Sequence, residues 1–591
     1  MMKKILLISL SLTLGIFYYM LIQLSVTDLK HSNAKSNTFS FVLHSNINQE
    51  VKLHIATERF KLHWVKCNDT QILFPAKKMQ WFEGVGEQLS FALKKGENHC
   101  QVETYNSRRT YTPNIKQKIT FFDYSILFIL LGIPIFYLIF IVFIKGLEQI
   151  KPRSIAVLSI IPKDTTLPKL LWAILFAGIL IRIFYFQKFG IMTFQHDWHG
   201  HIEFIKVIAE NWTLPLASKG LEYPQQPLYY LITGGLYALL TQFGLDDGDA
   251  LYGLGYFSLL CSMLFLYYSY RFLTLVTQSL WVRTVAIIFV SLTPSLVYLC
   301  ARINNDALVM ALSAYTLYAI VNSYQSGFKT GFYAALIGVS LLFMTKISAA
   351  PMELLLFGLL IVAFYQVEES QRSIVQKRLY CFSVVGMFLL GFTLLRVYLP
   401  IEGTLHMVNS SAHYPNQSIE ALGLDYFGTF HITSLLQAGY SHVFGDDAIR
   451  YSFLTYQYGT MFFGEFDYTY FVQKSEGLKA VMQGILLLGL LYVLGFLTYI
   501  IKLHQAPLLH KLLFATLVLN LLLILKFMFS YPVICNTDFR YFVASFALFA
   551  LVFAQGLDSL RHSKWMRYVL NASLGMLVVF ELVFFGLMLL V

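Results

Sequence analysis

Long apolar runs separated by short polar segments make up most of the chain. An apolar run of about 20 residues is long enough to cross a bilayer as a helix. Runs that fit this description lie at 5–24, 124–143, 170–186, 250–270, 284–300, 307–324, 330–347, 351–366, 379–398, 481–501, 511–529, 541–556 and 569–590. The pattern predicts a polytopic α-helical membrane protein with about 13 transmembrane helices.

The segment 27–121 has a different pattern. Apolar and polar residues alternate with a period of two in Thr38–His44, Glu50–Thr57 and Gln88–Leu93, which predicts β-strands. The stretch LSFALKKGENHCQVETYN is expected to form two strands joined by a glycine-containing turn. We therefore expect a small extracytoplasmic β-sandwich at 27–121. It follows an N-terminal membrane anchor (1–26) and precedes a transmembrane domain (122–591).

The run Leu228–Phe243 decides the predicted topology. If it crosses the membrane, Arg271 and Arg283 lie outside the cell. If it lies in the interface or re-enters, both arginines are cytoplasmic and Asp306 faces outward. The second topology obeys the positive-inside rule and is preferred. It gives outer loops at 188–249 and 399–480. The later basic residues then fall on the cytoplasmic side, namely Lys329, Arg372, Lys377, Arg378, Arg561, Lys564 and Arg567.

Composition agrees with this topology. Of 591 residues, 57% are hydrophobic and 13% are charged, whereas soluble domains carry about 25% charge; the mean hydropathy is +0.60. The net charge of +11 is explained by lysines and arginines in cytoplasmic loops, so no nucleic-acid partner is expected. Cys67 and Cys100 lie in the polar segment, where a disulfide would form in an oxidising compartment, although the sequence alone leaves the pairing open.

The first outer loop holds a dense group of titratable side chains, His196, Asp197, His199, His201 and Glu203. Asp197 and His201 are four residues apart, so on a helix they would share a face and could hold a divalent metal, or an acceptor and its proton. A carboxylate at the membrane edge is costly and usually functional, which favours a role for Asp197. His196 and His199 are more simply explained by contact with water.

Four more charged residues fall on the outer side in this topology. Asp306 is either an acid that stabilises the start of a helix or a second catalytic acid. Lys346 and Arg540 either extend toward lipid headgroups or bind a phosphate. Glu465, in MFFGEF, is either an acid or a structural hydrogen-bond partner, and the structural role is preferred.

Several motifs, taken in order, resemble one family. They are D-x-x-x-H (Asp197, His201), QQPLYY (225–230), LTPSLVYLCARINNDAL (292–308) and the pair Thr345–Lys346. This set resembles the GT-C superfamily of membrane glycosyltransferases, with the dolichyl-phosphate-mannose protein mannosyltransferase and aminoarabinose transferase group as the nearest branch. FLTYQYGTMFFGEF and NTDFRYF are similar to markers of bacterial members. The resemblance covers about residues 170 to 560, without the sandwich.

The resemblance implies transfer of a sugar from a polyprenyl-phosphate donor to a hydroxyl of a glycan, lipid or protein, with inversion. The reaction would occur at the outer face of the bacterial inner membrane. Asp197 matches the loop acid that takes the acceptor proton, and Asp306 matches a second loop acid. Charge and sidedness lead us to assign the phosphate to Lys346 and Arg540. The expected substrate-binding residues also include His201, Gln226 and Glu465.

One position departs from the family. Relatives often show Glu-Lys-Pro or His-Pro-Pro where this chain has Gln225-Gln226-Pro227. The change removes an acid that could bind metal and a lysine that could bind phosphate, so the requirement for a divalent metal stays open. Gln226 could still hydrogen-bond a sugar or a phosphate.

Two other classes of protein share some of these features. A lipid-linked glycan polymerase, ligase or flippase also has many spans and a large outer loop, but is expected to rely on arginine and histidine in the late loop. A transporter should place ionisable residues near the bilayer midplane. In this chain the acids fall at helix ends and in loops, so a transferase is favoured.

Overall fold

The computed structural model describes residues 25–33, 38–45, 49–56, 61–68, 70–73, 87–93, 96–105, 114–118, 167–191, 198–217, 220, 222–367, 369–398, 425–438, 452–465, 468–530 and 534–590. The chain divides into two compact units, 1–160 and 161–591. His196, Asp197, the predicted spans at 5–24 and 124–143, and much of the loop 399–480 lie outside the described residues.

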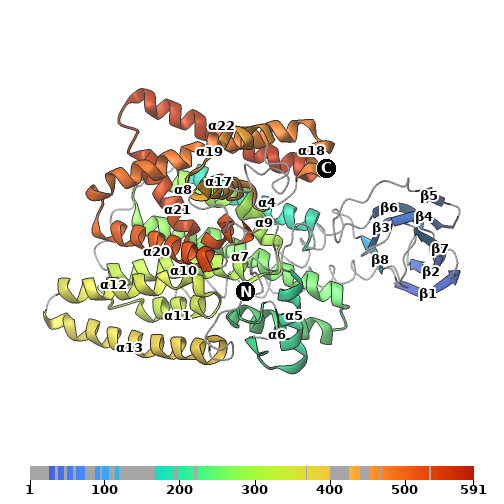
Figure 1. Cartoon of the computed structure of the whole chain (residues 1–591), viewed down its shortest axis with the longest axis horizontal. Helices are drawn as coiled ribbons and strands as arrows, with labels where there is room; N and C mark the ends of the chain where they lie inside the picture. The colour runs from blue at the N-terminus through green and yellow to red at the C-terminus, as the bar shows by residue number, and fades with distance from the viewer. Residues whose placement is uncertain are drawn as a thin grey trace, which may run out of the picture. The chain divides into compact units, whose positions relative to one another are not determined.

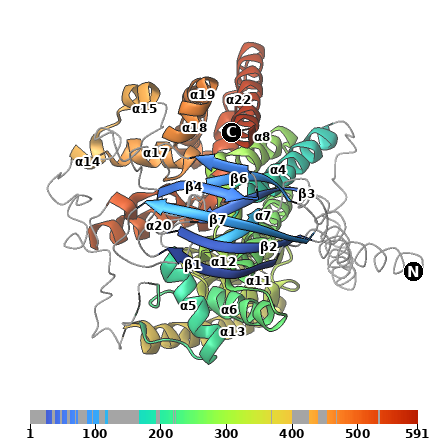
Figure 2. The same cartoon turned by 90° about the vertical axis from the view of Figure 1, so that its right-hand side faces the viewer.

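In the described part of the first unit, eight strands form two antiparallel sheets (Figure 2). The strands are β1 (Ser25–Asn33), β2 (Thr38–Ser45), β3 (Gln49–Ala56), β4 (Lys61–Cys67), β5 (Thr70–Leu73), β6 (Glu87–Leu93), β7 (Gly96–Tyr105) and β8 (Asn114–Lys118). Their order is β1-β2-β7-β4-β5 in the larger sheet and β6-β3-β8 in the smaller one. The three strands predicted from alternation are confirmed, while the packing of the two sheets into a sandwich stays a prediction.

The stretch LSFALKKGENHCQVETYN forms two strands, β6 and β7, but they do not pair with each other. β6 pairs with β3 in the smaller sheet, and β7 lies between β2 and β4 in the larger one. The two predicted strands are confirmed, but they belong to different sheets, because closeness along the chain does not fix the pairing. Each strand finds its backbone hydrogen-bond partners in strands distant along the chain.

Cys67 and Cys100 form a disulfide between β4 and β7. They face each other in the register of this strand pair, and both are buried. The bond joins residues 33 positions apart, and closing a loop of this length stabilises a fold by about 4 kcal/mol in the chain-entropy model. The structure thus decides the pairing that the sequence left open.

The second unit is built of helices (Figure 1). The α-helices are α4 (Leu167–Phe189), α5 (Trp198–Asn211), α6 (Leu228–Gln242), α7 (Asp247–Val276), α8 (Leu280–Leu292), α9 (Pro294–Tyr298), α10 (Asn305–Gln325), α11 (Phe332–Phe343), α12 (Pro351–Gln366), α13 (Glu369–Thr393), α14 (Asp425–Gly428), α15 (Ile432–Ala438), α17 (Phe453–Phe463), α18 (Thr469–Lys474), α19 (Glu476–Lys502), α20 (Leu508–Ser530), α21 (Phe546–Asp558) and α22 (Lys564–Leu590). The short tighter helices are η4 (Leu299–Ala301), η5 (Ile347–Ala349), η10 (Leu503–Gln505), η11 (Ile534–Thr537) and η12 (Phe539–Ser545), and α13 continues into a wider turn at Leu394–Tyr398.

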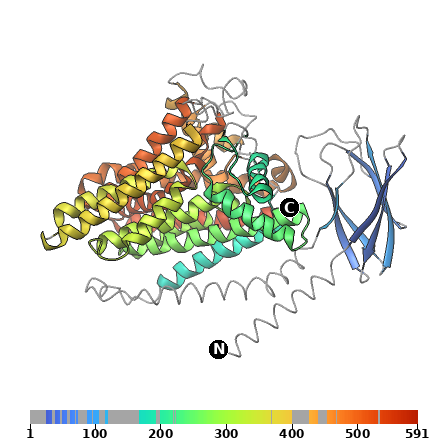
Figure 3. The ribbon, with the colours of Figure 1, turned by 90° about the horizontal axis from the view of Figure 1, so that it is seen from below.

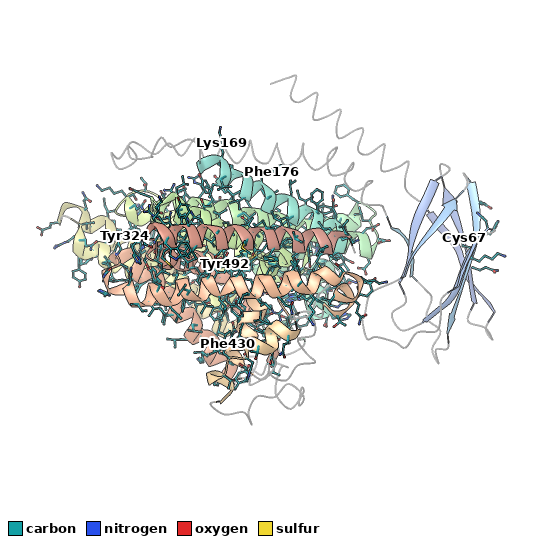
Figure 4. The ribbon with its side chains drawn as sticks, turned by 90° about the horizontal axis from the view of Figure 1, so that it is seen from above. Cys67, Lys169, Phe176, Tyr324, Phe430 and Tyr492 are labelled. Atoms are coloured by element: carbon teal, nitrogen blue, oxygen red, sulfur yellow. A yellow bond between two sulfur atoms is a disulfide. The ribbon has the colours of Figure 1, made fainter. Side chains whose placement is uncertain are left out.

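Nine helices within the described residues are long and apolar enough to cross a membrane, and the number is ten if α8 and α9–η4, which meet at a bend of 56°, form one span. Large apolar side chains face outward on these helices, as Phe176 (61% exposed) does in Figure 4, whereas Tyr492 (0% exposed) lies inside. These features support a multi-pass membrane protein. The total of about 13 spans stays a prediction, since α11 has only 12 residues and two predicted spans lie outside the described residues.

The predicted non-crossing segment Leu228–Phe243 forms α6, a helix of 15 residues. Such a helix is about 22 Å long, shorter than the hydrocarbon core of about 30 Å. It packs against α5 (Figure 1) and is not among the helices long enough to span. The interfacial position of Leu228–Phe243 stays a prediction.

The long helices of the second unit run side by side (Figure 3), so their connections gather at two ends. At one end α7 joins α8, α10 joins α11, α19 joins α20 and α21 joins α22. This end carries Arg283, Lys329, Lys502, Lys511, Arg561 and Lys564 and is called the basic end below. The opposite end holds the start of α10, the turn before η5, the end of α17 and η12. Asp306, Lys346, Glu465 and Arg540 therefore share one end of the bundle.

One buried arginine holds the bend between α8 and α9. Pro294 cannot donate the amide hydrogen that would continue α8, so carbonyl groups near the break need other donors. Arg182 of α4, 0% exposed, supplies them. It donates to the carbonyl oxygens of Val290 (2.9 Å), Ser291 (2.7 Å), Leu296 (3.5 Å) and Gly178 (3.1 Å), and to Ser262 Oγ (2.7 Å).

Candidate functional site

Six charged side chains meet at the end of the bundle opposite the basic end, and we call them the charged cluster: Arg302, Asp306, Lys346, Glu465, Asp538 and Arg540. Five of them are at most 9% exposed, and the Lys346 side chain is 12% exposed. Since isolated buried charges are very unfavourable, the cluster depends on mutual pairing.

Asp306 and Lys346 form the first ion pair of the cluster. Asp306 lies in the first turn of α10, and Lys346 directly precedes η5. Lys346 Nζ donates to Asp306 Oδ1, while Asn304 Nδ2 lies 3.4 Å from Asp306 Oδ2. Lys346 Nζ also lies 5.5 Å from the ring centre of Tyr541, a cation–π distance. Asp306 is therefore both a helix-start acid and a paired member of the cluster.

Asp538 and Arg540 form the second ion pair, at the start of η12. Asp538 Oδ1 accepts a hydrogen bond from the Arg540 backbone amide (3.1 Å), and Arg540 Nε lies 3.3 Å from Asp538 Oδ2. Burial and the nearby Glu465 carboxyl raise the pKa of Asp538 to about 6, although Arg540 and Arg302 act in the opposite direction. Asp538 can therefore exchange a proton near neutral pH.

Glu465 reaches the cluster through a turn that needs glycine. α17 ends at Phe463, and Gly464 has φ 69° and ψ −167°, a conformation that residues with a side chain rarely adopt. The turn buries Glu465, whose Oε1 accepts a hydrogen bond from Tyr456 Oη of α17. The structural role favoured from the sequence is thus observed. The effect of Glu465 on Asp538 shows that it also belongs to the cluster.

Arg302 supplies the third positive charge. Its guanidinium lies 5.1 Å from the ring centre of Tyr298, and it interacts electrostatically with both Asp306 and Asp538. Sequence reasoning gave no role to Arg302 or Asp538, although they lie close in the chain to Asp306 and Arg540. The signal was the short spacing within RINND and NTDFR.

The segment around Gln225 and Gln226 forms hydrogen bonds with Thr393, Asn305 and Arg396. Gln226 is 1% exposed, and its Nε2 donates to Thr393 Oγ1 of α13 (2.8 Å). Asn305 of α10 donates to Gln225 Oε1 (3.2 Å). Arg396, beyond α13, donates to the carbonyl oxygens of Gln225 (2.8 Å) and Tyr223 (2.9 Å). The two glutamines therefore connect this segment to α10 and α13, and Gln226 Oε1 keeps an unused acceptor within the described residues.

His201 does not belong to the charged cluster but connects to it through Tyr230. It is buried in α5 and shares a hydrogen bond with Tyr230 Oη (Nδ1 to Oη 2.8 Å), and Tyr230 is within electrostatic reach of Asp306. On the same helix, Glu203 accepts a hydrogen bond from Tyr223. Burial, followed by that carboxylate, raises the pKa of Tyr223 to about 12. His199 is exposed and lies against Trp198.

The described residues contain no group of three His, Cys, Asp or Glu side chains that could hold a metal ion. Asp197, the suggested metal partner of His201 and the predicted base, directly precedes α5 and lies outside the residues described. Its role stays a prediction. Of the predicted site residues, the structure brings together Asp306, Lys346, Glu465 and Arg540, and places His201 and Gln226 in the surrounding layer.

The whole sequence matches no protein-family model and no curated protein. Membership of the GT-C superfamily therefore stays a prediction that rests on the sequence motifs.

Proposed function

We propose that the protein is an inverting glycosyltransferase that moves a sugar from a polyprenyl-phosphate donor to an acceptor hydroxyl. The supporting observation is the convergence of Arg302, Lys346 and Arg540 with three buried acids at one end of a bundle of membrane-length helices. Cations suit the charge of a phosphate, and an arginine fork also matches its geometry.

The position of the charged cluster at the end of the bundle suits a phosphate that is attached to a lipid. Its members lie at helix ends, where the headgroups of a bilayer would lie, while the apolar flanks of the bundle would contact the acyl chains. The prenyl tail of the donor would stay in the bilayer. The basic end would face the cytoplasm under the positive-inside rule, so the cluster would face the outside of a bacterial inner membrane.

The proposed reaction is a single displacement. The acceptor oxygen attacks the anomeric carbon, the bond from that carbon to the phosphate oxygen breaks, and its electron pair leaves with the polyprenyl phosphate. The acceptor proton passes to a carboxylate, for which Asp197 is the proposed base. Arg302, Lys346 and Arg540 stabilise the charge that grows on the phosphate. Asp306 holds Lys346 in place, as its ion pair with Lys346 indicates.

A lipid-linked glycan polymerase, ligase or flippase is the alternative, because it would handle the same phosphate. The two proposals differ in the transferred group and in the movement of the lipid. A transferase moves one sugar and releases polyprenyl phosphate, whereas a flippase moves the intact donor across the bilayer.

The test uses the full-length protein in lipid nanodiscs with polyprenyl-phosphate sugars labelled in the sugar and membrane extract as the acceptor source. We expect labelled product and free polyprenyl phosphate in equal amounts. Arg540→Gln should lower the rate about 100-fold, the usual order for loss of a charged group that stabilises a transition state. The matched control is Lys474→Gln, which removes an exposed cation at the last residue of α18. Absence of transfer from every donor, with an unchanged envelope in a deletion strain, would contradict the proposal.

A further inference from the structure

Asp538 and Glu465 are two buried carboxyl groups that interact electrostatically. Asp538 directly precedes η12, and α17, which ends just before Glu465, packs against η12. Gln457 donates to the carbonyl oxygen of Thr537, and Thr460 Oγ1 accepts from the Phe539 amide (3.0 Å), so α17 fastens the chain on both sides of Asp538. The glycine turn at Gly464 directs Glu465 back along α17 to Tyr456, the residue before Gln457. The two acids are 1% and 2% exposed.

The titratable groups around this pair come from several elements. They are Arg540 and Tyr541 of η12, Arg302 after η4, Tyr298 of α9, Asp306 of α10, Lys346 before η5 and Tyr456 of α17. Lys346 is paired with Asp306. Arg302 and Arg540 are thus the cations that act on Asp538. With all acids and bases ionised, the charged cluster has no net charge.

An anionic ligand would make the net charge of the cluster negative. A phosphodiester brings one negative charge, and an uncompensated charge in a buried site costs several kcal/mol. One proton taken up by the cluster removes the cost. Asp538 Oδ2 can accept this proton: within the described residues it makes an ion pair with Arg540 Nε (3.3 Å) but no hydrogen bond. Two carboxyl groups that interact electrostatically take up protons in a coupled way and titrate as a unit.

We propose that Asp538 and Glu465 share one proton, and that this proton is taken up when a phosphodiester monoanion binds the charged cluster. The inference rests on the proposed function only in its choice of ligand. The pair makes the site proton-coupled: the donor binds together with a proton, and that proton is available to the phosphate group that leaves. The pKa of Asp538, raised to about 6 by burial and by Glu465, places the exchange close to neutral pH.

The binding test uses farnesyl methyl phosphate, a phosphodiester whose own charge is constant from about pH 5 to about pH 9. Calorimetry in two buffers of different ionisation enthalpy counts the protons taken up per ligand. For the wild type we expect uptake approaching one proton, and an affinity that falls by up to about tenfold per pH unit above about pH 6. Binding with no proton uptake and no pH dependence would overturn the proposal.

Two nearly isosteric variants locate the proton. Asp538→Asn keeps an acceptor for the Arg540 amide, and Glu465→Gln keeps an acceptor for Tyr456. Each should bind the phosphodiester at high pH about as tightly as the wild type does at low pH, and without proton uptake. Asp247→Asn is the control, because Asp247 is an exposed carboxylate paired with Lys206 (2.8 Å). This control should keep the pH dependence of the wild type.

A ligand-free measurement separates this inference from the proposed function. Infrared titration of the protein in nanodiscs follows the carbonyl band of protonated carboxyl groups. We expect a band that disappears as the pH rises through about 6 and that is missing in both variants but present in Asp247→Asn. A wild type that shows this band but binds no phosphodiester would contradict the phosphate site alone. Absence of the band would overturn the shared proton.

Discussion

The helical unit buries positive charge in two different ways. Arg182 is a single cation whose donors are used by neutral oxygens, namely Ser262 Oγ and the carbonyl oxygens of Gly178, Val290, Ser291 and Leu296. The charged cluster instead balances three cations against three acids, and polar atoms beside it keep unused capacity, among them Asn304 Oδ1 and Gln226 Oε1.

This difference distinguishes a charge needed for folding from charges that can bind a ligand. Arg182 donates hydrogen bonds to carbonyl oxygens at the break between α8 and α9. All its donors are used, so none is left for a ligand, and its removal should affect folding. The charged cluster is neutral through ion pairs, which can be rearranged when another anion arrives. Its members should therefore affect ligand binding and pH dependence even where stability is preserved.

The largest effect is expected at Arg182. Arg182→Met leaves several buried carbonyl groups without donors, each costing about 1–3 kcal/mol, so we expect little folded protein in the membrane. Arg182→Lys should be nearly as damaging, because one ammonium group cannot reach acceptors spread over α4 and the α8–α9 bend. The yield of monodisperse protein in mild detergent measures this. Lys169→Met, on the exposed start of the same helix, is the control; a wild-type yield of Arg182→Met would contradict the structural role.

The next largest effect on stability is expected at the Asp306–Lys346 ion pair. Lys346→Gln leaves the Asp306 carboxylate buried without its lysine, which should cost about 3–5 kcal/mol of stability. Adding Asp306→Asn should restore most of the stability, because no unpaired charge remains. Phosphodiester affinity should stay low in the double variant. Thermal unfolding and calorimetry together test this, and recovery of both stability and affinity would show that the pair is only structural.

Asp538 should make stability depend on pH in a defined direction. Its pKa in the folded protein, about 6, lies above the ordinary value of 3.8, so the folded state holds this proton more tightly than the unfolded state. The contribution is present below about pH 4 and is lost as pH rises through about 6, with a total of up to about 3 kcal/mol. Unfolding curves of the wild type and Asp538→Asn across this range measure it. The difference between them should grow with pH, and a constant difference would contradict the assignment.

The smallest effect concerns the turn that positions Glu465. Gly464→Ala should cost about 1–3 kcal/mol, because its φ of 69° is unfavourable for a residue with a Cβ atom. Gly575→Ala is a matched control, since a Cβ there meets nothing within 4 Å in α22 and alanine is the better helix former. Thermal unfolding should rank the wild type between the two variants. Equal stability of both would mean that the turn carries no strain.

The sequence by itself determined the elements and the end of the bundle at which each charged residue lies. Span positions depend on local apolar runs, and the distribution of lysine and arginine predicts a direction for each span. These local rules placed Asp306, Lys346, Glu465 and Arg540 at one end, where the structure also brings them together. That α6 does not cross the membrane stays a prediction.

Only the tertiary structure decided which of these residues meet. Lys346 pairs with Asp306 across 40 positions, Glu465 acts on Asp538, and Gln226 bonds to Thr393. β6 and β7, neighbours in the chain, belong to different sheets. The physical reason is the same in each case. Helix and strand formation follow from nearby residues, whereas pairing follows from packing between segments far apart in the chain, where no local pattern specifies the partner.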